Sequence, residues 1–240
     1  MTERQNIKRR QDMTERQDMT SNIVAYVGID NFDIILYLSR ILIRLGKKVL
    51  LVDHSDTMSL KYSIPQPEGF NTDSEIMHYR NVDFTTALIT KEMQALYDDI
   101  LIAYGFNKFI MDISICNYIV YVTNAYRYNQ ERFGCIAYDM YIRGELKKAL
   151  LIRDVSDAAV NSILVASKID KGLTEEGISV LFKDDRDDKN SLRYHNNRMY
   201  KFKDISNEMK IYLRQQTMKL HPEITEGKIK TAQCQAGKGR

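Results

Sequence analysis

The sequence predicts a three-layer α/β fold, in which a doubly wound, mostly parallel sheet is covered by helices on both faces. Short apolar runs that fit buried strands alternate with longer segments whose apolar residues recur at helical spacing. The first such unit is complete, with an apolar run at Ile23–Val27, a helical pattern over Phe32–Leu45 and a second apolar run at Val49–Val52. Its short connections predict parallel strands joined by a right-handed crossover.

The boundaries of this first unit follow from the residues beside it. Gly28 ends the first strand, and Asp30 and Asn31 offer side-chain oxygens that would cap the helix N-terminus. Gly46 ends the helix, because glycine readily adopts the left-handed conformation common just after a helix C-terminus. The second strand ends at Asp53.

The remaining elements are assigned from the same two patterns. The polar segment His54–Asp83, which contains two of the three prolines, is predicted to be a loop, and Thr85–Tyr104 a helix. Asp157–Asp170 is predicted to be a helix, with a strand at Ile163–Ala166 as the alternative. The further elements are strands at Phe109–Asp112, Tyr118–Thr123, Ala149–Arg153 and Ile178–Phe182, helices at Tyr126–Lys148 and Ile205–Leu220, and a loop at Lys183–Lys189.

Length and composition fit one domain with extensions at both ends. The chain has 240 residues, of which 44% are hydrophobic, enough for one α/β domain at 22–222. Residues 1–21 repeat Met1–Gln5 as Met13–Gln17 and are almost without apolar side chains, which predicts a disordered polar leader, or an upstream extension with Met13 or Met19 as alternative starts. Residues 223–240 are predicted to be a flexible basic tail. The formal charge of +3 lies largely in these two ends and gives no strong indication of nucleic-acid binding.

Cysteine use and hydropathy indicate the compartment. The three cysteines are far apart and lack Cys-x-x-Cys spacing, which indicates a reducing environment. The four histidines are equally scattered, so no metal site is predicted. No apolar run approaches the roughly 18 to 20 residues of a membrane span, and the N-terminus has no apolar h-region. We therefore expect a cytoplasmic protein without a transmembrane segment.

The segment Leu-Gly-Lys-Lys-Val-Leu-Leu-Val-Asp at Leu45–Asp53 follows a strand, a turn and an apolar helix. This order resembles the opening of the MinD/ParA class of P-loop ATPases, in which the first strand leads into a Walker A loop and the second ends in an aspartate. Lys108–Asp112 resembles their Walker B strand, and Tyr118–Thr123 the strand after it. The resemblance covers Ile23–Tyr128 and implies a P-loop NTPase-like fold.

The turn after the first strand departs from the family pattern. A working P-loop needs several glycines to wrap the phosphates, a lysine for their oxygens and a Ser or Thr for Mg²⁺. The turn Gly28–Asp33 has one glycine, and Ser21–Gly46 contains no lysine. Asp30 and Asp33 stand where the phosphate charge would lie and would repel a triphosphate. We therefore expect a capped turn from which the phosphate cradle has been lost.

The resemblance assigns roles to the residues of a degenerate nucleotide site. Asp53 would position water or metal and Asp112 would support Mg²⁺, although both are also explained as loop caps at strand ends. No catalytic residue and no metal are predicted; no cofactor is expected, and ATP with Mg²⁺ is the alternative. The candidate residues are Gly28, Asp30, Asn31, Phe32, Asp53 and Asp112.

Two other motifs compete with this interpretation. Leu50–Asp56 resembles the acidic first strand of response-regulator receivers, but a receiver would not have a complete strand–helix unit before it. Ser167–Asp170 resembles a guanine-reading motif in which Asp170 would pair with the base. If this segment is helical, that match is accidental.

The resemblance and the missing lysine lead to two hypotheses. The first is a non-hydrolysing scaffold or positioning factor, a pseudo-ATPase with protein partners and a homodimer across the former nucleotide face, nearest to the pilus-localisation (TadZ/CpaE-like) branch. The second is a nucleotide-binding ATPase of the same class, acting in spatial organisation or partition, in which Arg40, Arg44 or a residue of a partner replaces the lysine. The modest charge disfavours a third, a DNA-binding partition protein.

Overall fold

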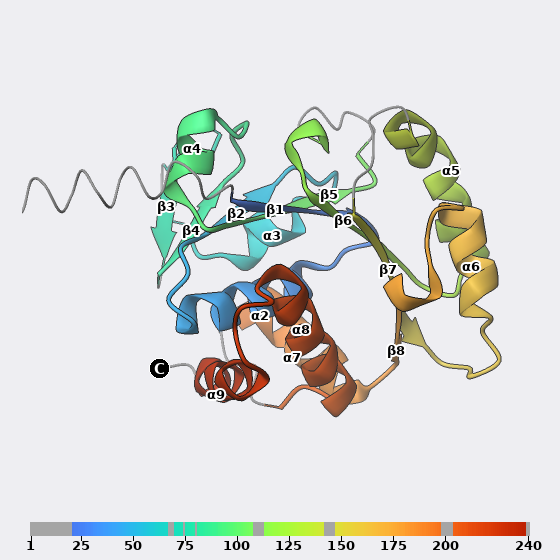
Figure 1. Cartoon of the computed structure of the whole chain (residues 1–240). Helices are drawn as coiled ribbons and strands as arrows, with labels where there is room; N and C mark the ends of the chain where they lie inside the picture. Colours follow the sequence, from blue (N-terminus) through green and yellow to red (C-terminus); the bar gives the residue numbers. More distant parts are fainter. Residues whose placement is uncertain are drawn as a thin grey trace, which may run out of the picture.

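A computed structural model of the chain describes residues 21–66, 70–73, 75–79, 81–107, 113–141, 147–197 and 204–238. Eight strands form one sheet in the order β3-β4-β2-β5-β1-β6-β7-β8 (Figure 1). The pair β3–β4 is antiparallel and every other neighbouring pair is parallel, so the predicted mostly parallel sheet is confirmed. The strands are β1 (Asn22–Gly28), β2 (Val49–Asp53), β3 (Met77–Tyr79), β4 (Val82–Thr85), β5 (Asp99–Gly105), β6 (Tyr118–Thr123), β7 (Lys147–Val155) and β8 (Ile178–Phe182).

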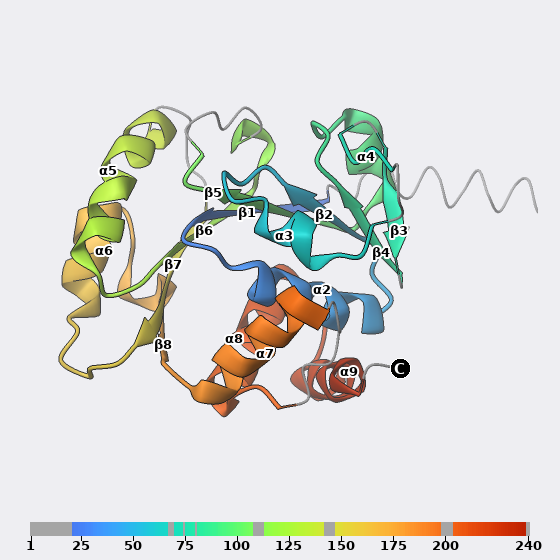
Figure 2. The same cartoon turned by 180° about the vertical axis from the view of Figure 1, so that it is seen from behind.

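Helices cover both faces of this sheet and give the predicted three layers. One face packs against α2, α3, α8 and α9 around one core, with α7 on the same side, and the other packs against α4, α5 and α6 around a second (Figure 1). Seen from behind, α7 lies beside α2 and α3 (Figure 2). The helices are α2 (Phe32–Arg44), α3 (Ser59–Ser63), α4 (Lys91–Leu96), α5 (Arg127–Tyr141), α6 (Ser162–Ile169), α7 (Asp185–Asn197), α8 (Asn207–Leu220) and α9 (Glu226–Gly237), with 3₁₀ turns at Ile113–Ile115 and Glu175–Gly177.

The first strand–helix–strand unit has the predicted elements. Every residue of β2 is buried, as is β1 apart from its half-buried first residue, as parallel strands covered on both faces must be. The residue after α2 is Leu45, followed by Gly46 at φ +83°, the left-handed region expected of a glycine there. The predicted strands at 118–123 and 178–182 coincide with β6 and β8, and α6 and α8 confirm the predicted helices at 157–170 and 205–220.

Two predictions before β6 are wrong. The segment Thr85–Tyr104, predicted as one helix, contains the end of β4, the short α4 and then β5, which lies between β1 and β2. The β5 sequence Asp-Ile-Leu-Ile-Ala-Tyr-Gly is a continuous apolar run, and periodicity alone does not separate such a run from a buried helix. The predicted loop His54–Asp83 also contains α3, β3 and the start of β4. The predicted strand Phe109–Asp112 lies outside the described residues.

Two predictions in the C-terminal third are also wrong. The predicted loop Lys183–Lys189 is largely the start of α7, whose first turn is acidic, as the positive end of the helix dipole favours. The predicted flexible tail 223–240 contains α9, and its residues Ile229, Ala232 and Ala236 are buried in the core that includes α2. This buried stripe consists mainly of small side chains, which gives it a weak hydrophobic pattern. The predicted leader lies outside the described residues except for Ser21.

A buried histidine joins the end of α8 to the amino ends of the central strands. His221 Nε2 lies 2.9 and 3.0 Å from the two carboxylate oxygens of Asp99, and its Nδ1 lies 3.0 Å from Glu223. Burial would lower the pKa of His221 and Lys47 acts in the same direction, but the hydrogen bond and charge of Asp99, helped by Glu223, outweigh them and raise it. Asn22 also donates to Asp99 at 3.1 Å. These residues form a hydrogen-bond network that connects the end of α8 to β1 and β5.

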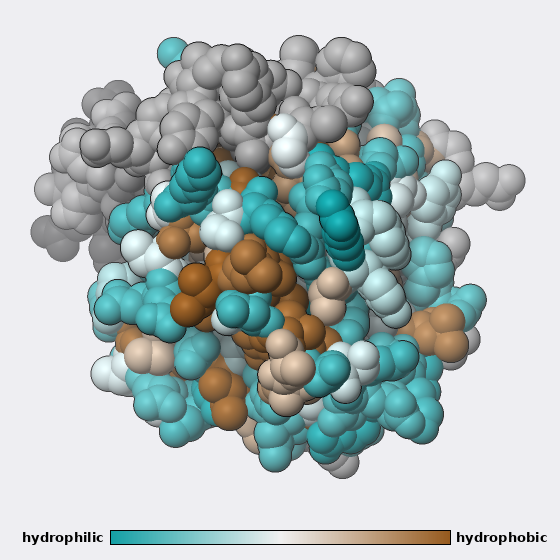
Figure 3. All heavy atoms as spheres, turned by 90° about the vertical axis from the view of Figure 1, so that its right-hand side faces the viewer, coloured by the Kyte–Doolittle hydropathy of each residue, from teal (hydrophilic) through white to brown (hydrophobic). Residues whose placement is uncertain are grey.

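Apolar side chains remain on the surface where the sheet ends at β8. Figure 3 shows them gathered on the side of the molecule that carries α5, α6 and β8. Ile163 and Leu164 of α6 and Phe182 of β8 are each exposed. The β8 edge itself is short, and its Phe182 N–H is bound by the carboxylate of Glu208 at 3.1 Å. A short, capped edge strand of this kind limits strand-to-strand pairing with other chains.

Candidate functional site

The candidate site lies where the parallel strands end at their carboxyl edge. The loops after β1, β2, β5, β6 and β7 all emerge there, because parallel strands point the same way. Five of the six residues named from the sequence lie in the loops after β1 and β2 or at their ends. The sixth, Asp112, lies outside the described residues.

The turn after β1 is pressed against β6. Gly28 has φ +127°, a conformation that favours glycine, and a Cβ atom there would lie 2.0 Å from the carbonyl oxygen of Val122 and 2.5 Å from the ring of Phe133. The next residue, Ile29, donates its N–H to the same Val122 carbonyl at 2.9 Å. The turn is therefore fixed to the neighbouring strand at the point where a P-loop would open around phosphates.

Asp30 connects this turn to the loop after β2. Its exposed carboxylate accepts hydrogen bonds from the hydroxyls of Thr57, at 2.6 Å, and Ser59, at 3.1 Å. Asn31 occupies the N-cap position of α2, but its side chain makes no capping hydrogen bond. The prediction that Asp30 and Asn31 cap the helix through their side chains is therefore wrong. Phe32 packs its ring against that of His195 from α7, with centroids 5.6 Å apart.

Asp33, in the first turn of α2, is bound by an arginine 120 residues further along the chain. The guanidinium of Arg153, at the end of β7, reaches its two carboxylate oxygens at 2.8 and 2.9 Å, and both side chains are buried. The same guanidinium lies 3.4 Å from the carbonyl oxygen of Asp30 and 3.2 Å from the carboxylate of Asp154. Burial would lower the pKa of Arg153, but Asp33 and Asp154 outweigh burial and raise it. The sequence therefore placed Asp33 correctly at the start of the helix. It did not show that Arg153 neutralises the carboxylate of Asp33 within the fold.

Asp53, at the end of β2, is buried and closes the loop that follows. One carboxylate oxygen accepts from the N–H of Ser55 at 3.0 Å and from its hydroxyl at 2.6 Å, and the other accepts from the N–H of Lys61 at 2.8 Å. Burial raises the pKa of Asp53, and these hydrogen bonds oppose that rise. The contacts match the loop-capping interpretation of this aspartate.

The central strand β5 brings no carboxylate to the edge. Among the described residues, it is the strand that precedes β6 along the chain. It ends in Ala103-Tyr104-Gly105, and Gly105 has φ +58°. Asp56, from the loop after β2, fills the space beside Gly105, accepts from the N–H of Phe106 at 3.2 Å and lies 3.6 Å from the guanidinium of Arg132. An acidic group is thus present here, but it comes from another loop and is already bound.

The arginines proposed as substitutes for the missing lysine lie further along α2. Arg40 is eight residues past Phe32, about 12 Å along the axis at 1.5 Å per residue, and its side chain is buried. Arg44 is the last residue of the helix. The arginine beside the turn is Arg153. The sequence placed it at the end of a predicted strand, and therefore on this edge, but gave no sign of its pairing with Asp33.

The guanine-reading motif is wrong, because Asp170 is used within the fold. Its Oδ2 is 2.6 Å from the ammonium of Lys148 and 3.1 Å from the hydroxyl of Tyr121, and its Oδ1 accepts from the N–H of Gly172. Burial would raise the pKa of Asp170, but these contacts, led by Lys148, lower it. The residue follows α6 near the start of β7, away from the carboxyl edge.

The residues that the structure describes contain no group of three or more His, Cys, Asp and Glu side chains placed to hold a metal ion. Within the same ranges, no helix is both long enough and apolar enough to cross a membrane.

Comparison with known proteins gives a result at the level of the fold. No protein-family model matches the chain, and no curated protein matches its sequence. Among solved structures, the ParA family ATPase of Chlorobium tepidum superposes with a TM-score of 0.55 at 12% identity, covering 91% of this chain and 98% of that one. The MinD cell division protein of Aquifex aeolicus gives 0.57 at 13% identity, with 82% and 97% covered. A putative plasmid partition protein of Borrelia burgdorferi, bound to AMPPNP, gives 0.56 at 14% identity, with 85% and 99% covered. The chain thus has the fold of the MinD/ParA P-loop ATPases.

Proposed function

We propose that this chain is a non-hydrolysing scaffold or positioning factor with the MinD/ParA fold, a pseudo-ATPase whose Walker A loop is degenerate. The fold similarity extends over most of the chain and nearly all of each neighbour. The candidate loop, however, has one glycine and no lysine. A protein that keeps the fold without the phosphate-binding groups retains its surfaces for protein partners.

The ion pair between Asp33 and Arg153 carries this proposal. In a working P-loop, a cation and the helix N-terminus face the phosphates. Here the guanidinium nearest the turn is bound by the buried carboxylate of Asp33. Gly28 is held against β6 and Asp30 is bonded to the loop after β2, so the turn is filled by contacts within the chain.

The neighbours indicate what kind of role to test. The Aquifex MinD protein also superposes as part of a MinC:MinD complex, and a further neighbour is McdA of Cyanothece in complex with ATP. By analogy, we infer a cytoplasmic protein that binds protein partners and forms a homodimer across the former nucleotide face. The pilus-localisation branch remains our specific assignment within the class. It rests on resemblance, because that branch includes atypical P-loops.

One observation favours an alternative, a nucleotide-binding ATPase with a non-standard phosphate site. Arg153 places a guanidinium within 3.4 Å of the backbone of the turn. If nucleotide binding released this arginine from Asp33, it would supply the cation that the loop lacks. Two neighbours are described with nucleotide, the Borrelia protein with AMPPNP and a MinD of Pyrococcus horikoshii with Mg-ADP.

The two functions are separated by titrating ¹⁵N-labelled protein with ATP, ADP and GTP in the presence of Mg²⁺. We expect no micromolar affinity by calorimetry, no amide shifts at Ile29–Phe32, no ATP turnover and an oligomeric state that does not change with nucleotide. Micromolar binding that moves these amides and is lost in Asp53→Ala, but retained in the exposed control Glu131→Gln, contradicts the proposal and supports the ATPase.

A further inference from the structure

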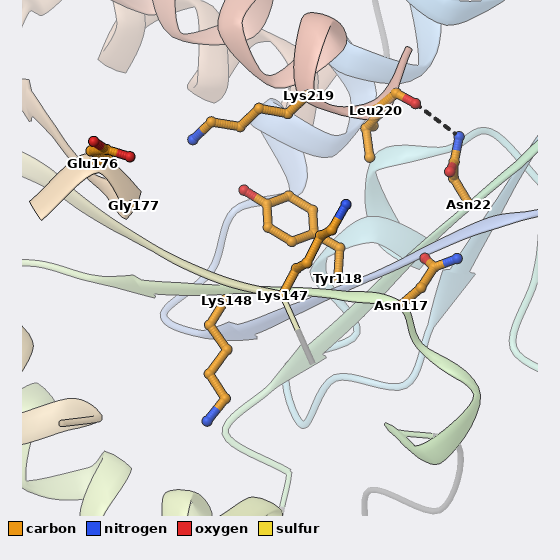
Figure 4. A pocket seen from close by; sticks show the side chains of 9 residues that line it. All are labelled: Asn22, Asn117, Tyr118, Lys147, Lys148, Glu176, Gly177, Lys219 and Leu220. Atoms are coloured by element: carbon orange, nitrogen blue, oxygen red, sulfur yellow. Dashed lines mark hydrogen bonds between the residues drawn. The ribbon is translucent and has the colours of Figure 1, made fainter. Parts of the chain in front are cut away.

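A pocket lies at the amino edge of the sheet, opposite the candidate site (Figure 4). It has a volume of about 390 Å³ and is formed by the first residues of β1, β6 and β7, the turn before β8 and the end of α8. This volume is within the range of small-molecule sites in proteins. None of the candidate residues at the carboxyl edge takes part in it.

Two ammonium groups line this pocket with no counter-ion among the described residues. Lys147 begins β7 and Lys219 lies at the end of α8, and neither has a salt bridge or hydrogen bond among the described residues. The neighbouring Lys148 points to the opposite side of the sheet in Figure 4, where it binds Asp170. This alternation is the period of two expected of a strand. It leaves Lys147 on the pocket side while Lys148 is neutralised elsewhere.

The other walls divide into polar groups that are already bound and an apolar surface. Asn22 donates to the carbonyl of Leu220 and Asn117 accepts from the N–H of Ile23, so both amides hold the frame of the pocket. The ring of Tyr118 stands in the pocket between the two lysines in Figure 4, and Leu220 lies beside it.

The electrostatics of the pocket favour a negative ligand. Partial burial lowers the pKa of Lys219, and no carboxylate among the described residues opposes this effect. Burial raises the pKa of Tyr118 to about 12, so its hydroxyl is neutral at pH 7. That hydroxyl makes a long bond of 3.4 Å to Gln216. The one carboxylate on the pocket wall, Glu176, is exposed and is not within salt-bridge distance of either lysine.

We propose that this pocket binds a small organic anion, with its carboxylate or phosphate group between Lys147 and Lys219 and its apolar body against the ring of Tyr118 and Leu220. An anion at this position would accept hydrogen bonds from both ammonium groups, and charge-assisted hydrogen bonds are among the stronger contacts available to a protein. Phosphate on such a ligand would bind at the edge of the sheet opposite the turn after β1. Anion binding in this pocket is therefore independent of whether the turn after β1 binds a nucleotide.

The test is a titration of ¹⁵N-labelled full-length protein with phenyl phosphate and with benzoate, using benzamide as the neutral control. We expect both anions to shift the amides of Tyr118, Lys147 and Gly177, with the larger affinity identifying the preferred head group. Lys219→Gln and Lys147→Gln, both exposed positions at which the fold is expected to persist, should each weaken binding about tenfold, the effect of losing one charge-assisted contact. Lys228→Gln, which removes the same charge from the exposed surface of α9, should change nothing.

Three results would overturn the inference. One is benzamide binding as tightly as the two anions, because the pocket would then select apolar bodies alone. A second is unchanged affinity in both lysine variants. The third is amide shifts confined to Ile29–Phe32, which would assign anion binding to the carboxyl edge and would contradict the proposed function as well.

Discussion

The buried ion pair between Asp33 and Arg153 gives the sharpest test of the fold and of the candidate site. Two parallel hydrogen bonds of 2.8 and 2.9 Å join the groups, and the side chains are 2% and 10% exposed. Removing one member of such a pair leaves an uncompensated buried charge and costs about 3–5 kcal/mol. We therefore expect Asp33→Asn and Arg153→Met each to lower the free energy of unfolding by about this amount.

The double variant and a surface control determine how much of that loss belongs to the pair. Asp33→Asn with Arg153→Met removes both charges, so its cost should be smaller than the sum of the single costs by about 1–3 kcal/mol. The salt bridge of Arg127 with Glu131 has side chains that are 85% and 63% exposed, and Arg127→Ala should cost less than about 0.5 kcal/mol. Urea denaturation at pH 7, monitored by circular dichroism, measures all four variants.

A loss below about 1 kcal/mol in both single variants, or fully additive losses, would refute the reasoning. Asp154 lies 3.2 Å from Arg153 and offers a partial substitute for Asp33, so the Asp33→Asn cost is the smaller of the two expected values. Asp33→Asn also frees the guanidinium beside the turn, and we expect this variant to bind inorganic phosphate at the Ile29–Phe32 amides more tightly than the parent chain.

Three more predictions concern the rest of the fold. Because the pKa of His221 is raised in the folded protein, its contribution to stability is complete below about pH 6.5 and lost as pH rises through the folded value, so urea midpoints should fall above pH 6.5 in the parent chain and less in His221→Asn. Gly28→Ala, which forces a Cβ into the β6 backbone, should cost more than about 2 kcal/mol by thermal melting, whereas Gly134→Ala, with open space in α5, should stabilise by up to about 1 kcal/mol. Ile229→Ala should cost about 2–5 kcal/mol if α9 is packed as described, and the exposed Ile211→Ala under about 0.5 kcal/mol in the same urea assay.

The sequence predicted the elements whose pattern is local and strong. The unit from β1 to β2 is bounded by Gly28, Gly46 and Asp53, and each has the expected place in the structure. β8 was also predicted to the residue, because it is a short apolar run that stands between charged segments. These features depend on a few neighbouring residues, so they could be identified without knowledge of the rest of the chain.

The elements that were predicted wrongly lack such a local pattern. β5 was read as the end of a helix, because its apolar run carries no period that separates a strand from a buried helix. α9 was missed because only one of its buried residues, Ile229, has a large apolar side chain. Each element can be identified only from the elements it packs against. These are the strands β1 and β2 for β5, and the helix α2 for α9.

The candidate site could be placed from the sequence, but its charge could not. Asp33 and Arg153 are 120 residues apart, and nothing near either residue indicates the other. Carboxylates still disfavour a triphosphate at this edge after Asp33 and Arg153 have paired. The loops at 28–33, 53–56 and 153–154 together carry five aspartates and one arginine, and Arg132 pairs with Asp56, so carboxylates outnumber the guanidinium groups of the described residues here.

A nucleotide would therefore have to bring Mg²⁺, and the metal would need a carboxylate with free oxygens. Asp53 is the aspartate that the family resemblance assigns to this task, but both of its oxygens already accept hydrogen bonds from Ser55 and Lys61. These three hydrogen bonds use three of the roughly four lone-pair positions of a carboxylate, so coordination of Mg²⁺ at more than one position would displace a donor of Ser55 or Lys61, at about 1–3 kcal/mol for each. The loop after β2 thus opposes metal binding by its own hydrogen bonding, separately from the missing lysine. For this reason, restoring a lysine to the turn alone should not restore ATP turnover.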